Sequence, residues 1–139
     1  MSRWLIFVLA VVAWSALALA QQPKPSATAA EARIAVEPVS FDFGSALQNK
    51  TLTKEFVVRN FGSTDLVIES VSTTCGCTVG QLDTRRIKPG MSVPLRVSLE
   101  TRTYSGPLRR AVLIRSNDTA KGLLEIRVLA NVQPAAPGK

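Results

Sequence analysis

The chemically versatile side chains of this chain are concentrated in one tetrapeptide, Cys75-Gly76-Cys77-Thr78. It contains both cysteines of a 139-residue chain that has no histidine. Two thiols can form a disulfide, exchange electrons with a partner, or bind a soft metal ion such as Cu(I). The absence of histidine excludes Ser-His-Asp and Cys-His catalytic groups and mixed Cys/His zinc sites. Redox or soft-metal chemistry is therefore expected only at Cys75 and Cys77, with Gly76 and Thr78 completing the motif loop.

The spacing of the two cysteines determines whether they can form a disulfide. In a regular strand, Cys75 and Cys77 would lie on one face, about 6.5 Å apart along the strand. A disulfide requires β-carbons roughly 3.5–4.5 Å apart, so an extended segment cannot form the bond. Gly76 can adopt backbone angles that other residues avoid, and a bend there makes the bond feasible. The three-residue loop would contribute only about 1.6 kcal/mol, and a strained small ring is easier to reduce than an ordinary structural disulfide.

Three interpretations of the motif stay open at this level. In the first, an oxidised Cys75–Cys77 turn, or two partly buried thiols, shapes a loop beside a sheet. In the second, the two residues are a redox pair. No helix N-terminus or histidine is available to favour the thiolate, and the cations expected to come close are Arg85, Arg86 and Lys88. In the third, the two thiolates bind Cu(I), whereas zinc would need further ligands from a second chain. Only the third interpretation includes a cofactor.

The first 20 residues have the features of a secretory signal peptide. Arg3 supplies a positive charge, residues 4–19 are almost entirely apolar, and Ala18-Leu19-Ala20 has the small residues of a cleavage site. About 16 apolar residues approach the roughly 17 that span a bilayer, so a retained anchor is the alternative. The cleavage site favours removal after Ala20. We therefore expect a periplasmic or secreted protein with no transmembrane segment after cleavage.

Two polar segments flank a single predicted domain. Residues 21–33 are rich in Gln, Pro, Lys, Ser, Thr and Ala and contain no large apolar side chain. Such a segment cannot bury enough surface to offset the entropy of ordering, so we predict a disordered linker. Residues 133–139, with two prolines and a glycine, are predicted to be a disordered tail. Residues 34–132, about 100 residues, are enough for one hydrophobic core.

The domain is predicted to be all-β. Apolar and polar side chains alternate in residues 92–100 and 124–132, which is the period of a strand with one buried face. Turn sequences rich in Gly, Pro, Asn and Ser separate the strands. This spacing favours an immunoglobulin-like β-sandwich of about seven or eight antiparallel strands, with a small barrel as the alternative. The other strands are expected at residues 34–36, 39–43, 52–60, 66–72 and 108–116.

The net charge of +7 predicts little about a target. Removal of Arg3 with the signal leaves 16 basic and 10 acidic side chains, a net charge of +6. A solvated basic face explains this charge, and attraction to anionic envelope material is the alternative. Nucleic acid is not expected, because aromatic stacking residues are not interleaved with the basic ones. The carboxylates are scattered singly, so no acid–base pair and no catalytic residue is predicted.

Six short segments of the chain follow one another in a recognisable order. They are Phe41–Gly44, Phe56–Gly62, Leu66–Ile68, Cys75–Thr78, Ile87–Gly90 and Ser116-Asn117. Together they resemble the exported bacterial domain of unknown function 1573, over nearly all of residues 36–132. The Cys-Gly-Cys-Thr segment with the Pro-Gly turn after it is the most specific part. The resemblance implies a seven- or eight-stranded sandwich, similar to the Hydin and major-sperm-protein class, that acts as an interaction module in the cell envelope. It implies no catalytic residues.

The sequence therefore predicts a non-enzymatic, exported interaction or scaffolding domain of the bacterial cell envelope. The expected partner is another envelope protein, bound through an exposed sheet edge or through loops at one end. The alternative function is a thiol redox or Cu(I)-handling protein that acts through Cys75 and Cys77. The sequence predicts no particular oligomeric state.

Overall fold

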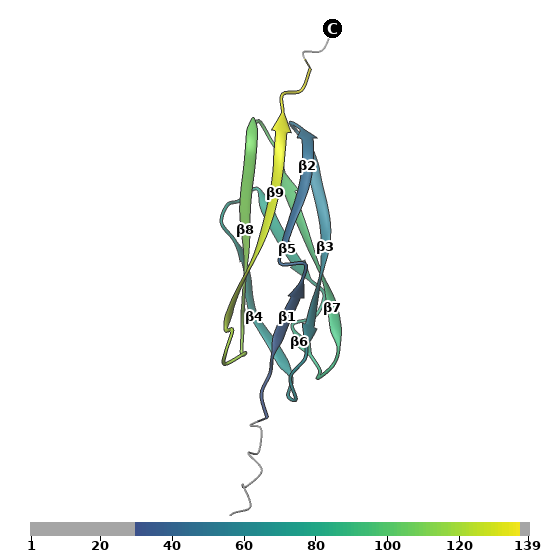
Figure 1. The fold of residues 1–139 in the computed structure, drawn as a ribbon, viewed down its shortest axis with the longest axis vertical. Helices are drawn as coiled ribbons and strands as arrows, with labels where there is room; N and C mark the ends of the chain where they lie inside the picture. Colours follow the sequence, from purple (N-terminus) through teal and green to yellow (C-terminus); the bar gives the residue numbers. More distant parts are fainter. Residues whose placement is uncertain (1–29, 137–139) are drawn as a thin grey trace, which may run out of the picture.

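Nine strands and no helix make up residues 30–136, the part of the chain that the computed structural model describes (Figure 1). The fold is all-β, as the alternating sequence pattern predicts. The predicted signal peptide and most of the predicted linker lie outside the described residues, as do residues 137–139. The strands are β1 (Ile34–Glu37), β2 (Ser40–Leu47), β3 (Thr51–Asn60), β4 (Leu66–Thr73), β5 (Thr78–Leu82), β6 (Arg86–Ile87), β7 (Ser92–Glu100), β8 (Gly106–Ser116) and β9 (Leu123–Gln133).

The strands form two sheets that pack face to face. The four-stranded sheet has the order β1-β3-β7-β5, and the five-stranded sheet has the order β2-β9-β8-β4-β6. All pairs are antiparallel except β2–β9, which is parallel. The prediction of antiparallel strands throughout was therefore wrong for this pair. The chain leaves the four-stranded sheet after Glu37 and joins the five-stranded sheet at Ser40, so β2 continues in the direction of β1 beside a different neighbour.

The core lies between the sheets and follows the predicted period of two. Phe56 and Val58 on β3 and Leu95, Val97 and Leu99 on β7 are fully buried in one layer. The other layer contributes the alternate residues of β4, β8 and β9. These are Leu66, Ile68, Leu108, Val112, Ile114, Ile126, Val128, Ala130 and Val132. Because each strand buries every second side chain, removal of this apolar surface from water drives the two layers together.

Two short strands are missing from the sequence-based prediction. β5 contains Gly80 and follows the cysteine motif directly, and β6 has only two residues, so neither shows a full alternation. Tertiary packing explains the glycine in β5: a β-carbon on Gly80 would lie 2.7 Å from Cγ1 of Val71 on β4. The two sheets approach closely at this point, and only glycine fits there without displacing a neighbour.

The packed domain begins earlier than the predicted boundary at Ile34. Ala32 is buried, and the carbonyl of Glu31 accepts a hydrogen bond from the N–H of Ser63 at 2.8 Å. The N–H of Arg33 donates to Oδ1 of Asn60. The C-terminal end of the predicted linker is therefore part of the packed domain. At the other end, Gln133 belongs to β9 rather than to a disordered tail.

Asp118, in the β8–β9 turn, anchors the start of β1. Its buried carboxylate accepts hydrogen bonds from the N–H groups of Ile34 (2.8 Å), Ala120 (2.7 Å) and Lys121 (2.9 Å) and from Nη1 of Arg33 (3.3 Å). Burial alone raises the pKa of Asp118, but these donors outweigh burial and hold the pKa below its ordinary value of 3.8.

Residues 30–136 include no helix that is long and apolar enough to cross a membrane. The ends of this described region lie at opposite ends of the sandwich, with β1 starting at one end and β9 finishing at the other (Figure 1).

We expect Asp118→Asn to lower the free energy of unfolding by about 2 kcal/mol at neutral pH, because the amide loses the charge that the four donors face. The lowered pKa of Asp118 means that its contribution is present above pH 3.8 and is lost as the pH falls through the folded-state value. The difference in free energy of unfolding between wild type and variant should therefore become smaller in acid. Urea unfolding at neutral and acidic pH measures it.

The control for this prediction is Asp65→Asn, which removes an exposed ion-pair partner of Arg86. Exposed pairs contribute little, so a loss below about 0.5 kcal/mol is expected. A gap for Asp118→Asn that stays constant from neutral to acidic pH would contradict the proposed anchoring charge.

Candidate functional site

The Cys75–Thr78 motif forms the turn that carries the chain from β4 in one sheet to β5 in the other. Cys75 and Cys77 are joined by a disulfide, with their α-carbons 5.4 Å apart. The N–H of Thr78 donates to the carbonyl of Cys75 at 3.4 Å, which closes the turn. The hydroxyl of Thr73 lies 2.8 Å and 2.9 Å from the carbonyl oxygens of Cys75 and Thr78. The oxidised turn is therefore the first of the three arrangements considered above.

The role predicted for Gly76 was wrong. The expectation was that glycine supplies backbone angles closed to other residues, but φ at Gly76 lies outside the left-handed region. A β-carbon added there would meet no atom within 4 Å. The bend therefore does not depend on the conformational freedom of glycine. The absence of a side chain at this exposed position instead leaves the space beside the disulfide open.

The two sulfur atoms differ in exposure. Cys75 is half-buried, whereas Cys77 is 2% exposed and belongs to the core cluster. The buried hydroxyl of Thr78 lies 3.8 Å from Sγ of Cys75 and 3.9 Å from Sγ of Cys77. A molecule that approaches from solvent therefore meets Cys75 first.

Arg110, on β8, contacts both sulfur atoms. Its Nε–H donates toward Sγ of Cys75 at 3.0 Å and toward Sγ of Cys77 at 3.3 Å. Its guanidinium carbon lies 5.0 Å from the centre of the Tyr104 ring, a cation–π arrangement. Beside it, Nη2 of Arg102 donates to the carbonyl of Gly76 at 3.1 Å.

Sequence reasoning missed Arg110, and two of the three cations that it named, Arg85 and Arg86, lie elsewhere. Arg85 donates to the carbonyl of Glu69, and Arg86 pairs with Asp65, so both are bound around β4 and β6 and not at the disulfide. A signal for Arg110 was present in the alternation of β8. Arg110 lies between the buried residues Leu108 and Val112, in a position that the period of two assigns to the interior.

In the oxidised state, the described residues form no metal site. Between residues 30 and 136, no three side chains of His, Cys, Asp or Glu lie close enough together to hold a metal ion. The cysteine sulfurs are joined to each other and are not thiolates. Binding of Cu(I) by the reduced pair stays a prediction.

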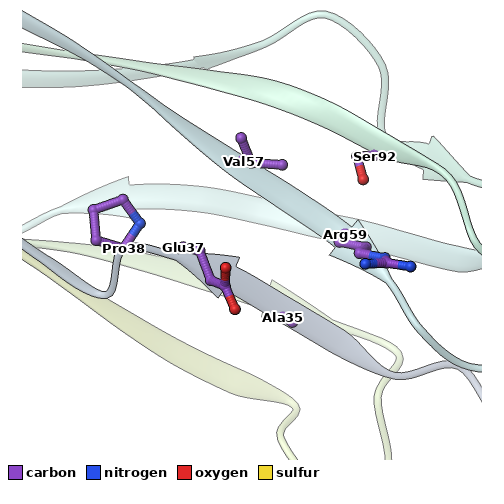
Figure 2. Close-up of a pocket in the computed structure, with 6 residues that line it drawn as sticks. All are labelled: Ala35, Glu37, Pro38, Val57, Arg59 and Ser92. Carbon is purple, nitrogen blue, oxygen red and sulfur yellow. The ribbon is translucent and has the colours of Figure 1, made fainter.

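A second candidate region lies where β1 ends (Figure 2). β1 pairs only with Val57–Asn60 of β3, whereas β7 pairs with β3 from Thr51 to Arg59. In the described region, no strand pairs with Thr51–Phe56 on the β1 side. At the end of β1 lies an open groove of about 700 Å³. Figure 2 shows its lining residues, which are Ala35, Glu37, Pro38, Val57, Arg59 and Ser92.

The basic side chains do not form a single face. Arg96 lies on β7, in the four-stranded sheet, whereas Arg115 and Arg127 lie on β8 and β9, in the five-stranded sheet. A hydrogen bond with Glu55 raises the pKa of Arg96, and one with Glu125 raises the pKa of Arg127. The positive charge is therefore divided between the two sheets and partly paired.

Residues 34–132 match the family model of a protein of unknown function, DUF1573. The chain belongs to this family. The match covers the nine-stranded sandwich almost from end to end and includes the Cys75–Cys77 turn. It confirms the family resemblance, and the family description assigns no activity. No curated protein is significantly similar to this chain.

Solved structures with the same fold come from bacteria and animals. A Porphyromonas gingivalis W83 protein of unknown function is 25% identical with a TM-score of 0.65, over 78% of this chain and 51% of that one. This chain thus spans about half of that protein. The ASH/PapD-like domain 7 of human CEP192 is 10% identical with a TM-score of 0.60, over 86% of this chain and 98% of that one.

A third similar structure is SSP-19 of Caenorhabditis elegans, a protein like the MSP-domain family. It is 10% identical with a TM-score of 0.51, over 69% of this chain and 97% of that one. At 10% identity, this structure and the human domain show the fold alone. The likeness confirms the predicted immunoglobulin-like sandwich, and these two neighbours are a PapD-like and an MSP-like domain.

We expect Gly76→Ala to fold with an unchanged disulfide and a free energy of unfolding within about 0.5 kcal/mol of wild type, because its β-carbon enters open space. The matched change is Gly62→Ala, whose β-carbon would overlap the carbonyl oxygen of Glu31. That variant should lose about 1–3 kcal/mol. Urea unfolding and intact mass measure both variants, and a loss of stability at Gly76 equal to that at Gly62 would contradict the open geometry.

Proposed function

We propose that this chain is a non-enzymatic protein-interaction domain of the bacterial cell envelope. It binds an extended segment of another envelope protein by adding that segment as a strand along the free edge of β3. The observation that carries the proposal is that residues 51–56 of β3 pair with β7 on one side and have no strand beside them on the β1 side. The signal-peptide pattern of the first 20 residues supports the location.

The free part of β3 has the length and regularity that strand addition requires. Its register with β7 is unbroken from Thr51 to Arg59, so the strand is paired continuously on the other side. The six residues that have no neighbour on the β1 side extend over about 20 Å, the length of a typical strand. No strand pairs with residues 51–56 on this side, although Nζ of Lys54 lies 4.5 Å from the centre of the Phe41 ring on β2. Main-chain bonds to an added strand supply affinity without requiring a particular partner sequence.

The other edges of the two sheets are less suited to a partner strand. β2 carries an irregularity between Asp42 and Ser45, where Gly44 has a φ of 72°, and such bulges obstruct regular pairing. β6 has two residues and β1 has four. β4 extends beyond β6, but its register with β8 is irregular between Ile68 and Ser70. β5 has five residues, and it packs closely against Val71 of β4 through Gly80.

The groove at the end of β1 gives the added strand a place for side chains. Pro38 and the half-exposed Val57 offer apolar surface, and Glu37 and Arg59 offer charge on either side (Figure 2). A partner strand that continues the line of β1 along β3 would begin at this groove. Alternate side chains of such a segment would point into the groove, which gives the interaction its specificity.

A photoreactive amino acid at Thr53 tests this proposal in the exporting bacterium. We expect irradiation to give one defined adduct with an envelope protein, and we expect Val57→Glu to reduce its yield at least tenfold by placing a charge in the groove. Mass spectrometry identifies the partner peptide, which should be an extended segment. An adduct with a second copy of this chain would show self-association and overturn the proposed partner.

The matched control is Val79→Glu on the edge strand β5, because Val57 and Val79 are both 50% exposed and lie on different strands of the same sheet. This change should leave the adduct at Thr53 intact. Equal loss in both variants, or no adduct at all, would contradict strand addition at β3.

A further inference from the structure

Arg110 is placed where a charged side chain needs a compensating partner. It occupies an inward position on β8 between two buried residues, Leu108 and Val112. Arg110 is half-buried, with Nε–H on the inner side, and a guanidinium that is partly removed from water is stabilised by an anion or good acceptors against it. In the described region, no carboxylate lies within ion-pair distance of Arg110, although five other arginines have such a partner.

The partners that Arg110 has are a carbonyl, an aromatic ring and two sulfur atoms. Nη1 donates to the carbonyl of Arg109 at 2.7 Å, and the ring of Tyr104 covers the guanidinium. Nε–H is directed at the disulfide, 3.0 Å and 3.3 Å from the two sulfurs. A neutral disulfide sulfur is a weak acceptor, so in the oxidised state this donor is poorly used.

Reduction of the disulfide would give Arg110 the anion that it lacks. A thiolate at either sulfur position accepts a charge-assisted hydrogen bond from Nε, and such bonds are about twice as strong as neutral ones. A nearby cation favours the thiolate over the thiol. Stabilisation of the reduced form makes a dithiol pair a stronger oxidant of other thiols.

We propose that Cys75–Cys77 is a thiol–disulfide exchange site that oxidises a protein dithiol, and that Arg110 stabilises the thiolate released in each step. The inference rests on the contacts of Arg110, and it is independent of strand addition at β3. The half-buried Cys75 and the exposed Gly76, which has no side chain, give a partner thiolate access to one sulfur, whereas Cys77 is enclosed by the core.

The exchange proceeds in two balanced steps. A thiolate of the partner dithiol attacks Sγ of Cys75, the Cys75–Cys77 bond breaks, and its electron pair leaves on Sγ of Cys77, beside Nε of Arg110 and the hydroxyl of Thr78. The second partner thiol loses its proton and attacks the partner sulfur of the mixed disulfide, which releases Cys75 as a thiolate. The partner dithiol has then lost two electrons and two protons, and the Cys75–Cys77 pair has gained the two electrons.

The test compares Arg110→Gln with Arg109→Gln in the mature chain, exported and purified without reductant. Arg109 is the neighbouring residue on the outer face of β8 and has no contact with the sulfurs. Each protein is equilibrated with mixtures of reduced and oxidised dithiothreitol, and alkylation with intact mass gives the reduced fraction. We expect Arg110→Gln to need at least tenfold more reduced dithiothreitol for half reduction, and Arg109→Gln to stay within twofold of wild type.

A second readout separates stabilisation of the thiolate from a structural role. The pH midpoint of thiolate absorbance in the reduced protein should rise in Arg110→Gln and stay constant in Arg109→Gln. Circular dichroism reports whether each variant is folded. Arg110→Met, which keeps a long unbranched side chain against Tyr104 without the charge, replaces Arg110→Gln if that variant does not fold. Equal behaviour of the Arg110 and Arg109 variants in both measurements would overturn the proposal.

The order of attack is tested with glutathione disulfide as the probe. Cys77→Ser keeps the accessible thiol of Cys75, and Cys75→Ser keeps the buried thiol of Cys77. We expect the mixed disulfide to form at least tenfold faster in Cys77→Ser, since attack requires access to the sulfur. Equal rates would overturn the assignment of Cys75 as the attacked residue. A reduced wild-type protein that binds Cu(I) stoichiometrically and exchanges no faster than Arg110→Gln would overturn the exchange site as a whole.

Discussion

The side chain of Asn60 is the constraint on which the path of the chain depends. It is fully buried, and its Nδ2 donates to the carbonyls of Thr64 (2.7 Å) and Ile87 (2.9 Å). Its Oδ1 accepts from the N–H groups of Gly62 (2.9 Å) and Arg33 (3.4 Å). One amide thus joins the turn after β3, the end of β6, and the segment before β1. Buried polar groups are costly when unpaired, so these partners hold β1 in one register on β3.

That register determines where β1 ends on β3, and hence which part of β3 has no neighbour. The chain departs at Glu37 and Pro38 for the other sheet, where β2 pairs in parallel with β9. This switch makes β2 an edge strand of the five-stranded sheet, and it leaves about half of β3 without a neighbouring strand on the β1 side. The chain passes between the sheets at several further turns, and at the turn from β4 to β5 the Cys75–Cys77 disulfide and Arg110 lie together. Each candidate site therefore lies at a point where the chain passes from one sheet to the other.

The alternating pattern predicted seven of the nine strands of residues 30–136 because each buries every second side chain in one core. It could not predict β5 and β6, since Gly80 is explained by contact with Val71 across the sandwich, and two residues carry no period. Nor could it predict the parallel pairing of β2, because residue period reports which face is buried and not which strand lies beside it. The prediction for Gly76 failed for a related reason: a glycine in a turn suggests unusual backbone angles, and here the turn forms without them.

The sequence by itself determined the all-β class, the family and the position of the only two cysteines, because period, turn residues and residue type are local properties of a chain. The tertiary structure decided what surrounds those cysteines and which edge is free. Arg110 is 33 residues from Cys77 along the chain and 3.3 Å from it in space, a contact that exists only once β8 pairs with β4. The free half of β3 likewise exists only because β1 pairs with the other half and then leaves. Long-range pairing of this kind depends on the fold as a whole, since each contact brings together residues that no short segment contains.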